Sequence, residues 1–142
     1  MDYLVNNLAH KVDKTIIDKN AIFSENLLSS FSGDKVSNFE KKYYELKKDS
    51  QYIDIDYASH LINIGFLFLD TNKNSKSINV FKFYTKEFSD SWYAYNCLGL
   101  AFEQNGQIKE ALINYKKALQ LNKENQNDYN SILKSRIKRL DN

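Results

Sequence analysis

The chain has 142 residues, of which 42% are hydrophobic and 27% charged, and this composition excludes a disordered chain and suits one domain with a buried core. A formal net charge of +2 is too small to indicate nucleic-acid binding. A single cysteine excludes an intramolecular disulfide, and no apolar run approaches the roughly 18 residues that a membrane span needs. Because the N-terminus also lacks the pattern of a secretory signal, we expect a soluble, cytoplasmic protein.

Residues 1–57 contain three runs of apolar residues at three- and four-residue steps, which predict three amphipathic helices. The runs are Leu4, Val5, Leu8, Val12 and Ile16; Ile22, Phe23, Leu27, Leu28 and Phe31; and Val36, Phe39, Tyr43 and Leu46. A break at residues 32–34 separates the second run from the third. Residues 52–57 alternate apolar and acidic side chains, and this pattern favours a helix cap by Asp54 or Asp56 over a short strand.

The next part of the chain repeats with a fixed period, the interval from Gly65 to Gly99, which we call the repeat interval. Side chains of like size recur at this offset. The pairs are Leu61 with Tyr95, Ile64 with Leu98, Phe68 with Phe102, Ser77 with Ala111, and Phe81 with Tyr115. A period of this length indicates two pairs of antiparallel helices, with small residues where the helices cross closely. We expect helices over residues 56–70, 74–87, 91–104 and 107–121, with a turn at Asn105-Gly106 in which glycine takes the left-handed conformation.

Residues 92–125 resemble a tetratricopeptide (TPR) repeat. The matching positions are Tyr95, Leu98, Gly99, Phe102, Gly106, Ala111, Tyr115, Ala118 and Leu119. Lys123 departs from the family pattern, because proline usually ends the second helix there. Residues 58–91 form a weaker repeat in the same register, in which Asn72, Ser77 and Tyr84 replace the usual glycine or alanines. The resemblance implies an all-α fold, a right-handed superhelix of helix pairs.

Residues 126–142 predict one more helix, which would close the last open face of the solenoid. Its apolar stripe consists of Tyr129, Ile132, Leu133, Ile137 and Leu140. The basic run at residues 134–139 is interpreted as a solvated helix end whose cations complement the helix dipole. The whole chain, residues 1–142, is therefore predicted to be a single all-helical domain, with N-terminal helices in 1–57, repeats in 58–91 and 92–125, and a capping helix in 126–142.

In the TPR family the first helix of each repeat lines a concave groove that holds a peptide or a helix. The resemblance places these positions at Ser59, Ile62, Phe66, Leu69, Asp70, Tyr93, Asn96, Leu100, Glu103 and Gln104, followed by Asn130, Lys134 and Lys138 from the capping helix. Asn96 could bond an extended backbone, because an amide both donates and accepts. The apolar members would form a floor of the kind that marks contacts. The apolar stripes of the N-terminal helices could equally fill this groove.

The sequence does not predict a catalytic or metal site. Ser-x-x-Lys strings occur at residues 32–35, 131–134 and 135–138, but the Gly-x-Ser-x-Gly and Lys-Thr-Gly motifs that would accompany them in hydrolases do not. His10 and His60 lack zinc-like spacing. Cys97 is expected to be a small buried apolar group without a cationic neighbour. We therefore predict neither enzymatic activity nor a cofactor.

The leading prediction is an interaction module that binds another protein or peptide, with self-association as a further possibility and with neither nucleic acid nor membrane as a partner. Two alternatives stay open. From about residue 10 to the end, through residues 39–48 and the two repeats, the chain loosely resembles the helical tail of some bacterial serine hydrolases of the β-lactamase-like and esterase groups. That resemblance implies an accessory domain for packing or dimerisation. The small size would also suit an immunity-type or inhibitor protein.

Overall fold

The computed structural model describes residues 19–31, 36–124 and 128–141. The chain divides into two compact units, Met1–Asp56 and Tyr57–Asn142, and each is described by itself. The first repeat, predicted to begin at residue 58, lies within the second unit. The predicted stripe from Leu4 to Ile16 and the break at residues 32–34 lie outside the described residues.

The N-terminal unit buries the two apolar stripes that fall within its described part. Residues 19–29 are helical, α2 spans Val36–Lys47, and the short 3-10 helix η1 spans Ser50–Tyr52. The buried side chains are Phe23, Leu27, Phe31, Phe39, Tyr43, Leu46 and Tyr52, whereas Ile22 is 46% exposed. Aromatic rings join the elements: the Phe31 and Phe39 centroids lie 4.5 Å apart, and those of Phe23 and Tyr52 lie 5.3 Å apart. The helical patterns predicted for these stripes are confirmed.

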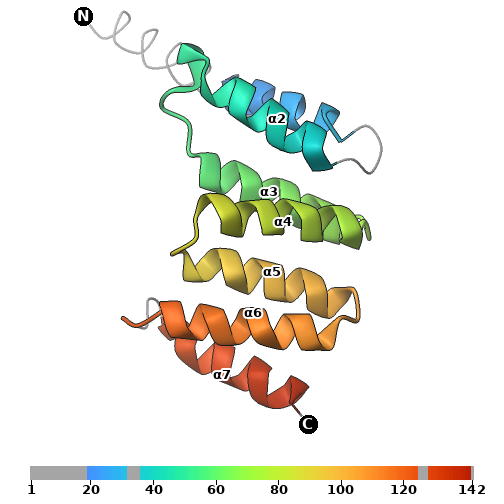
Figure 1. Cartoon of the computed structure of the whole chain (residues 1–142), viewed down its shortest axis with the longest axis vertical. Coiled ribbons are helices and arrows are strands. Elements are labelled where there is room, and N and C mark those ends of the chain that lie inside the picture. The colour runs from blue at the N-terminus through green and yellow to red at the C-terminus, as the bar shows by residue number, and fades with distance from the viewer. Residues whose placement is uncertain (1–18, 32–35, 125–127, 142) are drawn as a thin grey trace, which may run out of the picture. The chain divides into compact units, whose positions relative to one another are not determined.

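The C-terminal unit is a stack of helices in chain order (Figure 1). These are α3 (Tyr57–Asp70), α4 (Asn74–Glu87), α5 (Trp92–Gln104), α6 (Ile108–Leu121) and α7 (Tyr129–Leu140). The ends of α3 to α6 differ from the predicted ends by at most one residue. Each helix packs against the next, and α3 also contacts α5. No strand occurs in the described residues of either unit, and the predicted all-α, TPR-like fold is confirmed.

Two glycines allow the helices of each pair to cross closely. A methyl group added at Gly65 would lie 2.3 Å from the Phe81 ring, and one added at Gly99 would lie 2.7 Å from the Tyr115 ring. Both rings are completely buried, so they fill the space that the missing side chains leave. The two glycines and the two rings are each separated by the repeat interval, as the sequence predicts.

The turns inside the two pairs are also equivalent, although their sequences differ. Gly106 has φ of +74°, and Asn72, one repeat interval earlier, has φ of +57°. In the first turn the Lys73 amide donates to the Phe68 carbonyl at 2.7 Å, and in the second the Gln107 amide donates to the Phe102 carbonyl at 2.9 Å. These bonds are those of a Schellman C-cap, in which asparagine is the usual substitute for glycine. The Asn72 departure in the weaker repeat therefore leaves the turn intact.

Candidate functional site

The surface of α3 and α5 carries partly exposed apolar side chains, and two of them, Phe66 and Leu100, stand at equivalent positions of the two repeats. Ile62 and Phe66 on α3, and Tyr93 and Leu100 on α5, are each partly exposed. The Phe66 ring stands edge-on to the buried Phe81 ring, with the centroids 5.4 Å apart, so the base of this side chain is fixed by the core. We call these four residues the α3–α5 face. Ser59, Asp70 and Gln104 are exposed on the same helices.

Two predicted groove residues are instead buried. Leu69 is 3% exposed and belongs to the core. Asn96 is 1% exposed, and its Oδ1 accepts a hydrogen bond from Arg136 Nη1 at 2.8 Å. The amide that was expected to meet a partner's backbone therefore already has a partner within the chain.

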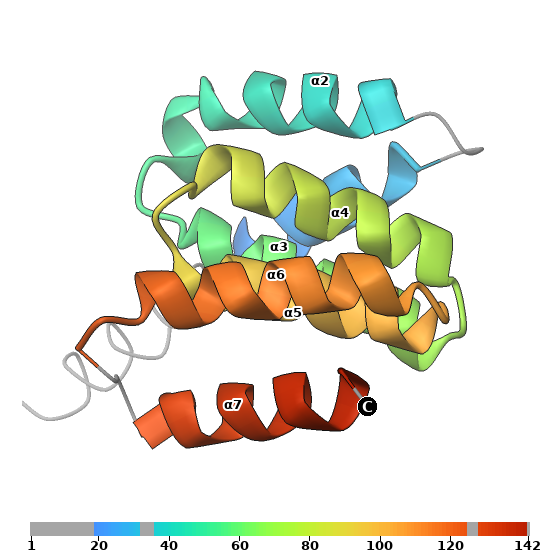
Figure 2. The same cartoon turned by 60° about the horizontal axis from the view of Figure 1, so that its bottom comes forward.

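Helix α7 packs against α6, bonds to α5 through its arginines, and runs in the same direction as α5 (Figure 2). At its start the rings of Tyr129 and Trp92 lie 4.9 Å apart. At its end Arg139 Nη2 donates to Glu103 Oε1 at 2.6 Å. The start of α7 thus contacts the start of α5, and the end of α7 contacts the end of α5. Because the two helices are parallel in this way, α7 occupies the place that the first helix of a further repeat would take. The predicted capping helix is thus present, beginning at Tyr129.

Three residues of α5 and α6 form a site for the two arginines of α7. Besides the Asn96 oxygen, the Tyr115 ring lies under Arg136, with the guanidinium carbon 5.6 Å from the ring centroid. The Glu103 carboxylate accepts from both Arg139 and the Tyr115 hydroxyl, the latter at 2.7 Å. Burial raises the pKa of Glu103, but the bonds from Arg139 and Tyr115 outweigh it and hold that pKa below its ordinary value. The carboxylate is therefore ionised at neutral pH. We call Asn96, Glu103 and Tyr115 the arginine site.

The other residues of α7 that were predicted to line the groove do not contact the arginine site. Asn130 forms a reciprocal amide pair with the buried Asn122, at 3.0 Å between the side chains and 3.1 Å to the Asn122 carbonyl. This pair follows the end of α6 and fixes the chain where the family pattern has proline and this chain has Lys123. Lys134 and Lys138 are exposed on the solvent side of α7, away from the arginine site.

Cys97 is fully buried in α5, as predicted. Burial raises the pKa of its thiol to about 12, and the hydrogen bond with Tyr93 and the charge of Arg136 only partly oppose this effect. Burial also raises the pKa of Tyr93 to about 12. Arg136 is the cationic neighbour that the sequence did not reveal. It does not activate the thiol, because desolvation is the larger effect.

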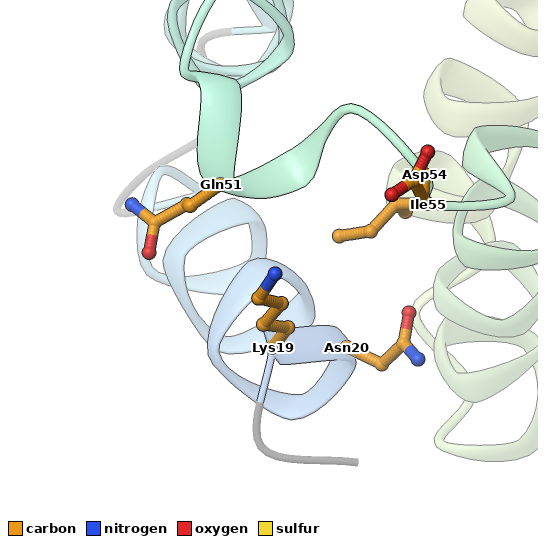
Figure 3. A pocket seen from close by; sticks show the side chains of 5 residues that line it. All are labelled: Lys19, Asn20, Gln51, Asp54 and Ile55. Atoms are coloured by element: carbon orange, nitrogen blue, oxygen red, sulfur yellow. The ribbon is translucent and has the colours of Figure 1, made fainter. Parts of the chain in front are cut away.

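The N-terminal unit has a pocket of about 160 Å³ lined by Lys19, Asn20, Gln51, Asp54 and Ile55 (Figure 3). The Gln51 side chain donates to Asp49 Oδ2 at 2.6 Å and points away from the centre of the pocket. The bond from the Gln51 amide and this side-chain bond lower the pKa of Asp49. The lining combines one lysine, one aspartate and two amides, and this set does not define a reaction.

Sequence reasoning missed the arginine site. The sequence feature that could have indicated the site is the spacing of Arg136 and Arg139, which are three residues apart. The same step leads back to Leu133, the buried residue of α7, so all three side chains lie on one side of the helix. The interpretation of this basic run as a solvated helix end overlooked the bonds of both arginines to α5, although Arg139 is still 59% exposed.

Within the described ranges, His, Cys, Asp and Glu side chains form no cluster of three or more that could bind a metal ion. None of the helices described here has the length and apolar character to cross a membrane.

Comparison with known protein families matches residues 92–125 to the model of the tetratricopeptide repeat. These residues comprise α5, α6 and the segment that follows them. No curated protein matches the chain. The match confirms the resemblance stated for this repeat, whereas the looser resemblance to hydrolase tails stays a prediction.

Proposed function

Because the chain carries a tetratricopeptide repeat, we propose that it is a protein–protein interaction module that binds a polypeptide on the α3–α5 face. The observation that carries this proposal is the pair of Phe66 and Leu100. These apolar side chains are one repeat interval apart, stand at equivalent positions of α3 and α5, and are both partly exposed. An apolar residue exposed at the same position of consecutive repeats offers two anchor points, one helix spacing apart, for one bound segment.

The chemistry of the face favours an apolar partner segment over a charged one. While α7 is docked, Glu103 is engaged by Arg139, so it offers no free negative charge to a segment on this face. Asp70 and Gln104 end the two helices and form a polar margin. A partner would thus be held by shape and by a few apolar anchors, with hydrogen bonds at the edge.

The proposal includes no catalytic step. Glu103 bonds to Arg139 and Tyr115, and the Cys97 thiol is buried, so neither group is offered as an acid, base or nucleophile. The proposal also includes the cytoplasmic location that the sequence leads us to expect.

A capture experiment tests it. The purified chain is immobilised, and bound proteins from a lysate of the source cells are identified by mass spectrometry. Phe66→Ala combined with Leu100→Ala should abolish specific capture. The matched control is Ile108→Ala combined with Ile113→Ala, which removes two apolar side chains, 37% and 66% exposed, from α6. Equal capture by the wild type and the Phe66/Leu100 variant would refute the assignment of the face. Capture of the same chain alone would identify self-association as the interaction.

A further inference from the structure

The contacts that hold α7 differ in kind from those that join the other helices. Seven residues of α5 are buried: Ala94, Asn96, Cys97, Leu98, Gly99, Ala101 and Phe102. In α7 only Leu133 is buried, although the helices are of similar length. The other apolar side chains of α7 that pack on the repeat are only partly buried, among them Tyr129, whose ring lies against Trp92.

Most of the named contacts of α7 are instead polar, and their outer parts are open to solvent. Arg139 has 59% of its side chain exposed, and the ion pair between Lys116 and Asp141 joins groups that are 55% and 54% exposed. The Lys116–Asp141 pair, which is exposed at both ends, contributes little and is screened by salt, whereas the Arg139 pair ends on a Glu103 side chain that is 20% exposed.

The surface beneath α7, in contrast, is built to receive arginine. Asn96 is 1% exposed and Tyr115 is completely buried, so both are fixed by the core of the repeat. Together with Glu103 they supply an amide oxygen, an aromatic ring and a carboxylate, and all three favour a guanidinium group. The groups are spaced so that arginines three residues apart on one helix meet them at once.

We propose that the arginine site is a receptor for an arginine-bearing helix and that α7 is its exchangeable internal occupant. A polypeptide partner reaches Asn96, Glu103 and Tyr115 by presenting two arginines one helical turn apart, with an apolar residue in the place of Leu133. This inference deepens the proposed function, on which it rests for the presence of a polypeptide partner, and it names the chemistry by which that partner competes with α7.

The probe is a fluorescently labelled peptide of residues 128–141, whose binding to the full chain is measured by fluorescence anisotropy. In the wild type the tethered α7 competes at a high effective concentration, so the peptide binds weakly. Arg136→Gln combined with Arg139→Gln vacates the site and should bind the peptide more than about tenfold more tightly than the wild type does. Lys134→Gln combined with Lys138→Gln removes the same charge from the exposed side of α7 and should bind like the wild type.

The arginine requirement is tested on the peptide as well. A peptide with glutamine in place of both arginines should not bind the vacated site. The proposal is overturned if the Arg136/Arg139 variant binds the peptide no more tightly than the wild type, or if the glutamine peptide binds as well as the arginine peptide.

Hydrogen exchange on the wild-type chain provides a measurement that does not depend on the folding of a variant. Saturating arginine peptide should raise amide exchange in α7 and leave α5 protected. Unchanged exchange in α7 would contradict the proposal. Because these assays require neither Phe66 nor an unknown partner, their failure is distinguishable from failure of the capture experiment, which tests the α3–α5 face.

Discussion

Gly65→Ala tests whether the first helix pair crosses as closely as described. The added methyl carbon would lie 2.3 Å from two carbons of the buried Phe81 ring. Overpacking of a core in this way costs about 1–3 kcal/mol, and the complete burial of Phe81 favours the upper end. Alanine recovers about 1 kcal/mol over glycine within a helix. We therefore expect the free energy of unfolding to fall by about 2 kcal/mol, and the melting temperature by on the order of 8 °C.

The assay is urea unfolding followed by circular dichroism, with Asn63→Ala, at an exposed position of the same helix, as the control for helix propensity. Combination with Phe81→Leu should relieve most of the cost, because the shorter side chain makes room for the methyl group. A coupling free energy of at least about 1 kcal/mol in this double-mutant cycle is expected. A Gly65→Ala variant as stable as the wild type would refute the close crossing of α3 and α4.

Three further predictions concern buried or paired groups of the C-terminal unit. Ser77→Ala should raise the free energy of unfolding by about 1 kcal/mol in urea, because the Ser77 hydroxyl is buried without a hydrogen-bond partner in the described part of the chain; a loss of stability would contradict this. Cys97 should not react with a thiol reagent at pH 8 until the chain is unfolded in guanidinium, since the thiol is buried and its pKa is raised to about 12; rapid reaction in native buffer is the opposing result. Because the pKa of Glu103 is lowered in the folded chain, its bonds to Arg139 and Tyr115 contribute stability that is fully present above the ordinary value of 4.5 and is lost as pH falls through the lower folded pKa. The stability difference between the wild type and Glu103→Gln should accordingly shrink below pH 4.5 in thermal melts, and a difference that stays constant down to pH 3 would contradict it.

The sequence was sufficient to predict the helical repeat because the features that define it are local or periodic. Gly65 and Gly99 are one repeat interval apart and meet aromatic rings that are separated by the same interval, so one offset identified both crossings. The substitution of Asn72 for glycine weakened the sequence signal, but asparagine tolerates the left-handed turn and preserves the geometry.

The contacts of α7 could not be predicted in the same way. Arg136 bonds to Asn96 across an interval of 40 residues, and no repeat or helical period connects these two positions. Amphipathic spacing identified α7 and its Leu133, but it does not specify which polar groups a basic residue will meet on the neighbouring helix. The same reasoning explains why Leu69 was expected in a groove and is instead buried, since the family position gives its place on α3 and not what covers it.

If α7 is exchangeable, the binding surface of the C-terminal unit has two parts with different access. The α3–α5 face keeps partly exposed apolar residues while α7 is docked, whereas the arginine site opens only when α7 leaves. A partner that engages Phe66 and Leu100 first could therefore bind before it competes with α7. Competition with α7 should depend more strongly on salt than binding on the α3–α5 face does, because it breaks partly exposed ion pairs.

Site-specific photo-crosslinking tests the central claim, that a polypeptide binds on α3 and α5, most directly. A photoreactive phenylalanine analogue is placed singly at position 66, 100 or 113, and the crosslinked partner is identified by mass spectrometry. Positions 66 and 100 lie on the α3–α5 face, and Ile113 is the 66% exposed residue on α6. We predict crosslinks to one and the same partner from positions 66 and 100 and none from position 113. A partner that crosslinks from position 113 and not from 66 or 100 would contradict the account.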